Sequence, residues 1–285
     1  MKKIALFIAA VISAPALAWT NGDVSKNVDF AGTITPEQYT QLWRWKVGTG
    51  LNDFKHNIQD MNQELKKLTI TVDSPKGLLY GATVEAMRAS AGMGAIPNIA
   101  FSDYEKKAVT LVQESTDGEG KGHMILPIKD EQNNKIGSLK INLTTVAKAG
   151  GPSADDPKLY LTYSVKALSS GNAFYGGLFP KCISSNNTAS GKLNRFDGAV
   201  NDSELRAMVK RHPLANNWSL KTTVVKNLCD QITLQQGYQT FKDGITAASY
   251  VLGIDTGQTL EATFDNPMTA TTKWSAPLNV AVTYN

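Results

Sequence analysis

The C-terminal stretch Trp274-Ser-Ala-Pro-Leu-Asn-Val-Ala-Val-Thr-Tyr-Asn285 decides the fold. Its large apolar residues, Leu278, Val280, Val282 and Tyr284, alternate with small or polar residues. A period of two places every large side chain on one face of a β-strand. We therefore predict a strong core strand at this end of the sequence, and such a strand needs a neighbour.

A second alternating stretch lies near the other end of the sequence. Its large apolar residues, and the glycine that shares their face, are Val24, Val28, Phe30, Gly32 and Ile34. Pro36 cannot donate a hydrogen bond to a ladder, so we expect it to end this strand. The simplest interpretation is that residues 19–36 form an arm, and that its strand is offered to an edge elsewhere.

The first eighteen residues have the pattern of a secretory signal peptide. Lys2 and Lys3 precede an apolar run over residues 4–12, and Ala16-Leu-Ala18 forms a cleavage site of the A-x-A type. The apolar run is too short to span a bilayer, which disfavours the alternative of a membrane anchor. We expect cleavage after Ala18 and export of the mature chain.

Composition narrows the class of protein. The formal net charge is +4, two units of which come from the signal lysines, so the mature chain is too balanced in charge to indicate nucleic-acid binding. Cys182 and Cys229 are the two cysteines. An even count in an exported protein favours a disulfide. Its loop of roughly 48 residues would contribute about 4 kcal/mol in the chain-entropy model. Two buried free thiols are the alternative.

Short apolar stretches separated by turn residues predict a mainly β protein. Strands are expected at 42–47, 67–72, 99–101, 108–112, 124–128, 136–146, 159–165, 245–252 and 260–264. Apolar residues at helical spacing predict a short helix within 51–65. Residues 149–157, rich in Gly, Pro and Asp, are interpreted as a loop and a candidate boundary.

Residues 168–236 differ from their surroundings, because both cysteines and the clearest helical signals lie there. Asn201-Asp-Ser-Glu204 is a capping box, and Pro213 should end the helix that it starts. Many short strands interrupted once by a mixed segment fit a β-sandwich with an inserted subdomain.

The sequence offers little for catalysis. Its three histidines share no motif, and no signature of a metalloprotease, hydrolase, nucleotide-binding loop or redox pair occurs. We therefore expect no enzyme activity, metal or cofactor. The loop aromatics Tyr104, Phe174, Tyr175 and Trp218 are of the kind that stacks on sugars. Buried loop anchors have the same signature, and that is the simpler interpretation.

Several ungapped stretches resemble one family. They are Val28–Thr35, Trp43–Leu51, Leu68–Val72, Ile96–Phe101, Phe174–Leu178, Gly257–Phe264 and Trp274–Tyr284. Through them, most of the mature chain is similar to the FaeG-type major fimbrial subunits and adhesins of chaperone–usher pili. The resemblance implies an incomplete immunoglobulin-like β-sandwich that a donor strand completes. It divides the chain into a signal peptide (1–18), a donor-strand arm (19–36) and a pilin domain (37–285). A mixed α/β receptor-binding subdomain would be inserted at about 152–236.

The resemblance also implies partners and an address. A periplasmic chaperone would lend a strand to the one that carries Leu278, Val280, Val282 and Tyr284. At an outer-membrane usher, the arm of the next identical subunit would replace it, with Gly32 at a shallow part of the groove. The protein would pass through the periplasm to a cell-surface fimbrium.

Host-cell glycoconjugates are the ligands that the resemblance implies. It places their binding site at Tyr104, Lys166, Ser169, Ser170 and Asn172. The sequence departs from the family in this loop, where Lys166 stands in place of an aromatic residue. A purely structural pilin is therefore one alternative. A secreted β-sandwich enzyme is another, although no pair of carboxylates or nucleophile–base pair is suggested by the sequence.

Overall fold

The computed structural model describes residues 42–62, 64–88, 96–156, 158–215 and 244–284, together with the backbone of 222–226. The predicted signal peptide and arm lie outside these residues, as do Trp218 and Cys229. Residues 38–285 form one compact unit. In the described part of the chain, no helix is long and apolar enough to cross a membrane.

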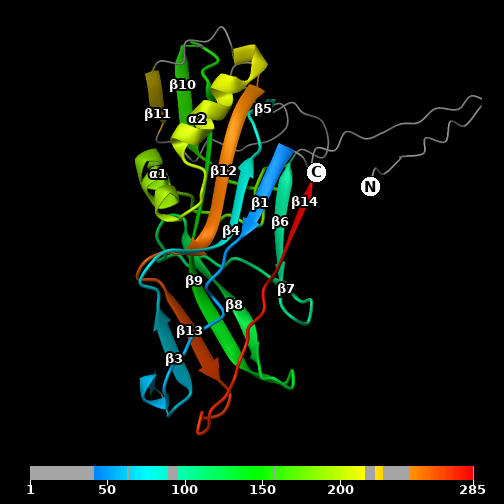
Figure 1. Ribbon diagram of the computed structural model, residues 1–285, viewed down its shortest axis with the longest axis vertical. Helices are drawn as coiled ribbons and strands as arrows, with labels where there is room; N and C mark the ends of the chain where they lie inside the picture. The colour runs from blue at the N-terminus through cyan, green and yellow to red at the C-terminus, as the bar shows by residue number, and fades with distance from the viewer. Residues whose placement is uncertain are drawn as a thin grey trace, which may run out of the picture. The chain divides into compact units, whose positions relative to one another are not determined.

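The described part of the chain is mainly β, as predicted (Figure 1). Its strands are β1 (Trp43–Val47), β2 (Met61–Asn62), β3 (Lys67–Thr71), β4 (Lys76–Thr83), β5 (Met87–Arg88), β6 (Pro97–Ser102), β7 (Ala108–Val109), β8 (Lys121–Lys129), β9 (Lys135–Pro152), β10 (Leu159–Ser164), β11 (Thr222–Lys226), β12 (Ile245–Ile254), β13 (Thr259–Phe264) and β14 (Asn279–Tyr284). The helices are α1 (Asn186–Arg195) and α2 (Asp202–Arg211), with short 3-10 turns η2 (Ile58–Asp60) and η3 (Pro213–Ala215).

The strands form two sheets around one main core. The larger sheet has the order β1-β4-β12-β9-β13-β3-β2, and the smaller one has the order β14-β6-β7. β8 and β10 both pair with β9, and β11 pairs in parallel with the other edge of β10. Buried residues of both sheets, such as Leu79, Leu143 and Phe101, pack together in the main core. β1 and β14 each stand at an edge of their sheet.

β9 is the longest strand and changes neighbours along its length. Its first half lies between β8 and β13, and its second half lies between β10 and β12. Burial alternates in the first half, but every residue from Leu143 to Pro152 is buried. The second half is covered on both faces because α1 and α2 contact β9 on the face away from the main core (Figure 1).

The capping box predicted at the start of α2 is confirmed. The Asn201 side chain accepts hydrogen bonds from the backbone nitrogens of Ser203 and Glu204, and the Glu204 carboxylate accepts one from the Asn201 nitrogen. These contacts satisfy donors that would otherwise be unpaired at the helix start. The apolar stripe of Leu205, Met208 and Val209 is buried.

Two predicted elements are wrong. Residues 51–65 do not form a helix: one 3-10 turn at 58–60 is followed directly by β2. Leu51, Phe54 and Met61 instead pack on the border of the main core from an irregular segment. Asn and Asp residues interrupt this stretch, and their side chains compete with helical backbone bonds; Asp60, for example, accepts from the Asn57 nitrogen at 2.8 Å.

The loop predicted at 149–157 is also wrong in its first half, because β9 continues to Pro152. Its glycines are strand residues. A Cβ on Gly150 would lie 1.9 Å from the hydroxyl oxygen of Tyr160 on β10, so the aromatic ring occupies the space that a side chain would need. Glycine is required at this position by the close approach of the Tyr160 ring, and it does not mark a turn.

Candidate functional site

β14 has the predicted two-faced pattern and is the edge strand of the smaller sheet. Val280, Val282 and Tyr284 are half-buried, while the residues between them are exposed. β14 pairs with β6 in antiparallel register, from Asn279 opposite Ser102 to Tyr284 opposite Pro97. Within the described residues no strand pairs with its other edge. The apolar face of β14 is therefore only partly covered.

β1 is the corresponding edge of the larger sheet. It pairs with β4 alone among the described strands. Trp43 is buried, whereas Trp45 is half-buried and its ring lies against β4, where a Cβ on Gly81 would come within 2.4 Å of it. The indole Nε1 of Trp45 donates a hydrogen bond to the Tyr284 hydroxyl at 2.9 Å. This bond joins the two sheet edges at one end of the gap between them.

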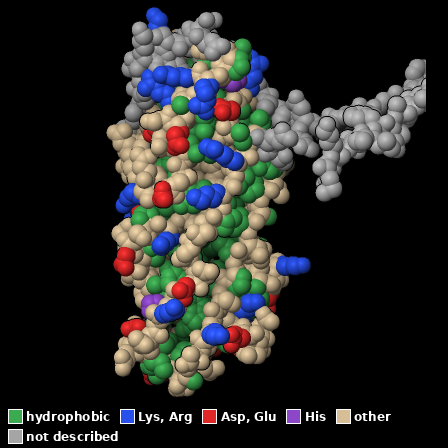
Figure 2. Space-filling view, viewed as in Figure 1, with side chains coloured by type: hydrophobic (Ala, Val, Ile, Leu, Met, Phe, Trp, Pro, Cys, Tyr) green, Lys and Arg blue, Asp and Glu red, His purple; other side chains and the backbone are tan. Residues whose placement is uncertain are grey.

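Partly buried apolar side chains lie along both sides of this gap. The β1 side carries Leu42, Trp45, Leu51, Phe54 and Met61, and the β14 side carries Met268, Trp274, Ala276, Leu278, Val280 and Tyr284. All of them pack against the fully buried core. Figure 2 shows a lengthwise band of apolar side chains on this face. We call the gap between the two sets the edge groove.

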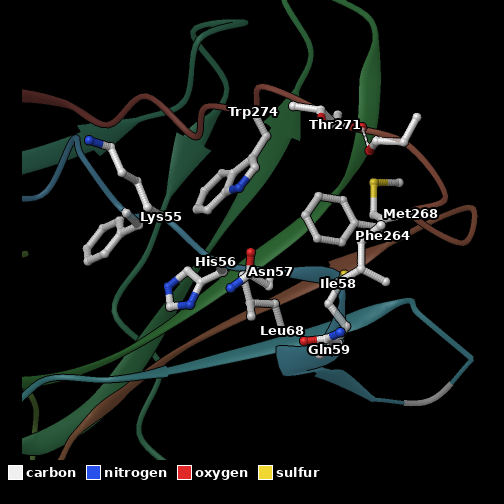
Figure 3. A pocket seen from close by; sticks show the side chains of 14 residues that line it. Lys55, His56, Asn57, Ile58, Gln59, Leu68, Phe264, Met268, Thr271 and Trp274 are labelled. Atoms are coloured by element: carbon white, nitrogen blue, oxygen red, sulfur yellow. Dashed lines mark hydrogen bonds between the residues drawn. The ribbon is translucent and has the colours of Figure 1, made fainter.

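A pocket of about 490 Å³ lies where the chain leaves β1 and approaches β14 (Figure 3). One wall is formed by residues 54–59, which follow β1, and the other by residues 268–274, which precede β14. Leu68 and Phe264 belong to its lining, and Trp274 faces them across the pocket. The pocket lies at the opposite end of the edge groove from the Trp45–Tyr284 hydrogen bond. It offers space for an apolar side chain.

The loop that follows β10 contains four of the predicted glycan-binding residues. Ser169 and Ser170 are exposed and Lys166 is half-buried. Asn172 is only 4% exposed. Its Oδ1 accepts hydrogen bonds from the backbone nitrogens of Leu168 and Ser169 at 2.9 and 3.1 Å. The buried Asn172 side chain therefore fixes the backbone of the loop by hydrogen bonds, whereas the two serines are exposed to solvent.

The structure does not bring Tyr104 to this loop. Residues 170–175 contact the beginning of β6, where the Asn98 side chain donates to the Ser170 carbonyl at 3.0 Å and the Ile99 nitrogen donates to the Tyr175 carbonyl at 2.8 Å. Tyr104 follows the end of β6 and has Lys129 5.0 Å from its ring centre. At about 3.3 Å per residue, β6 separates the two places by roughly 16 Å.

Comparison with known proteins gives the family. The profile described as "Fimbrial, major and minor subunit", Fimbrial_K88, matches residues 1–285. The chain belongs to this family. It is 39% identical to K88 fimbrial protein AB and 38% identical to K88 fimbrial protein AC, both from Escherichia coli, over the whole of each chain. The F41 fimbrial protein of Escherichia coli is 23% identical, again over full length. A fimbrial subunit of this kind is located in a cell-surface fimbrium.

Two neighbouring aromatic residues of this fimbrial subunit have different environments. Phe174 is a buried loop anchor, the simpler of the two sequence-based interpretations, and its ring stacks on Tyr250 at 5.1 Å and meets Trp43 edge-on at 5.3 Å. Tyr175, the next residue, is 42% exposed. Tyr175 thus has the exposed ring that Tyr104 was expected to supply. The sequence alone does not show which of the two adjacent rings is buried, because the Phe174 ring is covered by Trp43 of β1 and Tyr250 of β12.

A buried polar cluster holds the two helices of the fimbrial subunit on β9. Lys148 of β9 is fully buried, and its Nζ contacts Asp202 of α2 at 2.6 Å and the hydroxyl of Ser190 of α1. Asp202 also accepts from Thr162 at 3.1 Å. Burial lowers the pKa of Lys148, and the Asp202 carboxylate opposes part of that shift. The cluster fixes α1, α2, β9 and β10 to one another.

Cys182 is disulfide-bonded. Cys229, the partner that the cysteine count predicts, lies outside the described residues, so the pairing stays a prediction. Among the described residues, no cluster of three or more His, Cys, Asp or Glu side chains could hold a metal ion.

Proposed function

We propose that this chain is a major fimbrial subunit that polymerises by donor-strand exchange and also binds host-cell glycans. The observation that carries the proposal is the edge groove, in which two sheet edges that no other described strand pairs with flank a half-covered core. The occupant is the arm at residues 19–36 of the next identical subunit. Its alternating face of Val28, Phe30, Gly32 and Ile34 matches a groove that needs both backbone partners and apolar side chains.

Energetics support this occupant. An open sheet edge beside exposed apolar side chains is an aggregation hazard, and a protein that keeps one must cover it. Three large arm side chains at about 1.5–3 kcal/mol each would give roughly 5–9 kcal/mol of gross burial. Until the arm arrives, a strand lent by a periplasmic chaperone covers the groove, and an outer-membrane usher is where the exchange takes place.

Arm variants in the full mature chain test polymerisation. Phe30→Asp places a carboxylate on the inward face of the arm, whereas Ala31→Asp places it on the outward face. We expect Phe30→Asp to abolish fibres seen by electron microscopy and sedimentation, and Ala31→Asp to form them at the normal level. Normal fibres from Phe30→Asp would contradict donor-strand exchange.

The receptor loop, residues 166–178, supports the adhesin part of the proposal. Exposed hydroxyls at Ser169 and Ser170 and the exposed ring of Tyr175 are groups that hydrogen-bond and stack on sugars. Replacing both serines by alanine, or Tyr175 by alanine, should reduce haemagglutination at least tenfold with unchanged fibre yield. Glu131→Ala, on the exposed β8–β9 turn, is the control. Normal agglutination by all loop variants would favour a purely structural subunit.

A further inference from the structure

Phe174 lies between the edge groove and the exposed part of the receptor loop. On one side its ring contacts the aromatic residues of β1, at 5.3 Å from Trp43 and 6.4 Å from Trp45. On another side it stacks on Tyr250 of β12 at 5.1 Å. Trp45 is also the residue that hydrogen-bonds to Tyr284 of β14. One buried ring therefore touches the residue that joins the two groove edges.

The backbone at Phe174 is strained. Its φ is 68°, in the left-handed region that bulky residues rarely adopt. Such a conformation costs about 1–2 kcal/mol and persists only where the surroundings hold it. Here the surroundings are the rings of Trp43, Trp45 and Tyr250, together with a hydrogen bond from the Phe174 nitrogen to the Pro97 carbonyl at 2.7 Å. The conformation of the receptor loop thus depends on groups from both sheets.

The backbone of the same loop is fixed to the smaller sheet. Pro97 and Asn98, which bond to Phe174 and Ser170, lie opposite Tyr284 and Thr283 of β14. The loop therefore bridges the two sheets at the closed end of the edge groove: its backbone is held by β6, and its Phe174 ring is held by β1 and β12. Any change in the separation of β1 from β14 must move one anchor of the loop relative to the other.

We propose that Phe174 is a positioning residue that makes the order of the receptor loop depend on the filling of the edge groove. This inference rests on the proposed function. A donor strand between β1 and β14 would fix the two edges by backbone hydrogen bonds along the groove, in addition to the Trp45–Tyr284 side-chain hydrogen bond at its end. The aromatic cluster then holds Phe174 more firmly in its strained conformation, and residues 168–178 open less often. Fully assembled subunits bind glycan more tightly than unassembled ones.

The test uses the full mature chain with Phe30→Asp, which has an arm that cannot enter a groove, and a synthetic wild-type arm peptide of residues 24–35. Hydrogen–deuterium exchange is followed at residues 168–178 and, as an internal reference, at α2. Peptide binding is measured separately by calorimetry. Because the peptide also stabilises the whole fold, exchange at α2 gives the global effect, and we expect the peptide to slow exchange at 168–178 at least tenfold more than at α2.

Two further variants isolate the role of Phe174. Phe174→Leu should still bind the peptide within threefold, but the slowing at 168–178 relative to α2 should fall below threefold. Phe196→Leu, at a fully buried ring in a separate cluster under α1, should keep the full slowing. If Phe174→Leu does not fold, Trp45→Leu replaces it, because Trp45 is half-buried and contacts Phe174. Trp45 also lines the edge groove, so exchange is then measured at peptide concentrations that saturate this variant; the expected loss of slowing is the same.

The outcomes separate the two proposals. Peptide binding that slows exchange at 168–178 no more than at α2, or full slowing in Phe174→Leu or Trp45→Leu, would overturn the coupling and leave donor-strand exchange intact. Absence of any peptide binding would overturn donor-strand exchange, and the coupling with it.

Discussion

Trp45 and Tyr284 are 239 positions apart in the sequence, yet the indole nitrogen of one donates to the hydroxyl of the other at 2.9 Å. This hydrogen bond connects the edge strands of two different sheets. Tyr284→Phe removes the acceptor and keeps the ring. Because water can reach the half-buried indole, we expect a loss of about 0.5–1.5 kcal/mol in the free energy of unfolding. Urea unfolding measures it, with Tyr175→Phe at an exposed ring as the control. An unchanged midpoint would show that the edges are held by other contacts.

The two faces of β14 should respond differently to the same substitution. Val282→Asp puts a carboxylate on the half-buried face, and we expect it to destabilise the subunit by about 1–3 kcal/mol and to block fibre formation. Thr283→Asp, on the exposed face one residue away, should stay within about 0.5 kcal/mol and assemble normally. Equal effects of the two variants would contradict the assignment of an inward and an outward face.

Asn172 should act through the shape of the receptor loop. Asn172→Ala removes the acceptor of the Leu168 and Ser169 nitrogens, which water can partly replace in this exposed loop, so we expect a loss of about 0.5–1.5 kcal/mol and reduced haemagglutination. Asn172→Asp keeps an acceptor at the same place and should recover most of both. Thermal unfolding and agglutination titre measure the two effects. Poor agglutination by a fully stable Asn172→Asp would instead indicate direct contact of the amide with ligand.

The Lys148–Asp202 pair predicts an order of stabilities. Asp202→Asn leaves a fully buried ammonium without its carboxylate, and removal of one partner of a buried pair typically costs about 3–5 kcal/mol. Lys148→Met leaves a carboxylate that is 31% exposed and still accepts from Ser190 and Thr162, so its cost should be smaller. Chemical denaturation ranks the two variants. The reverse order would mean that Lys148 is accommodated without its charge.

The same pair predicts a pH dependence. The folded pKa of Lys148 is lowered from its ordinary value of 10.5, chiefly by burial. Below 10.5 the unfolded state therefore binds more protons at this residue than the folded state, so its contribution to stability rises as the pH rises toward 10.5. The stability difference between wild type and Lys148→Met should shift in favour of wild type between neutral pH and that value. Taking the difference removes the effect of buried tyrosines, which is common to both proteins. A constant difference would contradict the lowered pKa.

The sequence predicts those elements whose signal is local. The alternation of β14 and the capping box of α2 each lie within a few consecutive residues, and both are present in the structure. Gly150 misleads because its reason lies on another strand, where the Tyr160 ring occupies the space of its side chain. The helix predicted within 51–65 fails because its apolar residues line the border of a groove instead of one face of a helix.

The receptor loop and the edge groove are also predictable only where their signal lies within a few consecutive residues. The serines of the receptor loop and the inward face of β14 follow from the resemblance and from periodicity. The partners of the Phe174 ring do not, because Trp43 and Tyr250 lie far from it in the sequence. The resemblance places Tyr104 near the receptor loop, and Tyr104 is close in sequence to β6, which the loop contacts. It lies at the far end of β6, however, and the length of that strand separates it from the loop.

The most direct test of the account is the refolding stability of a mature chain that lacks residues 19–36, with and without the arm peptide of residues 24–35. Without the arm, the edge groove has nothing to fill it. The account predicts an unstable or aggregating protein that the peptide strongly stabilises, with a rise in unfolding temperature that grows with peptide concentration. A truncated chain that folds well and does not respond to the peptide would contradict donor-strand completion of this fold.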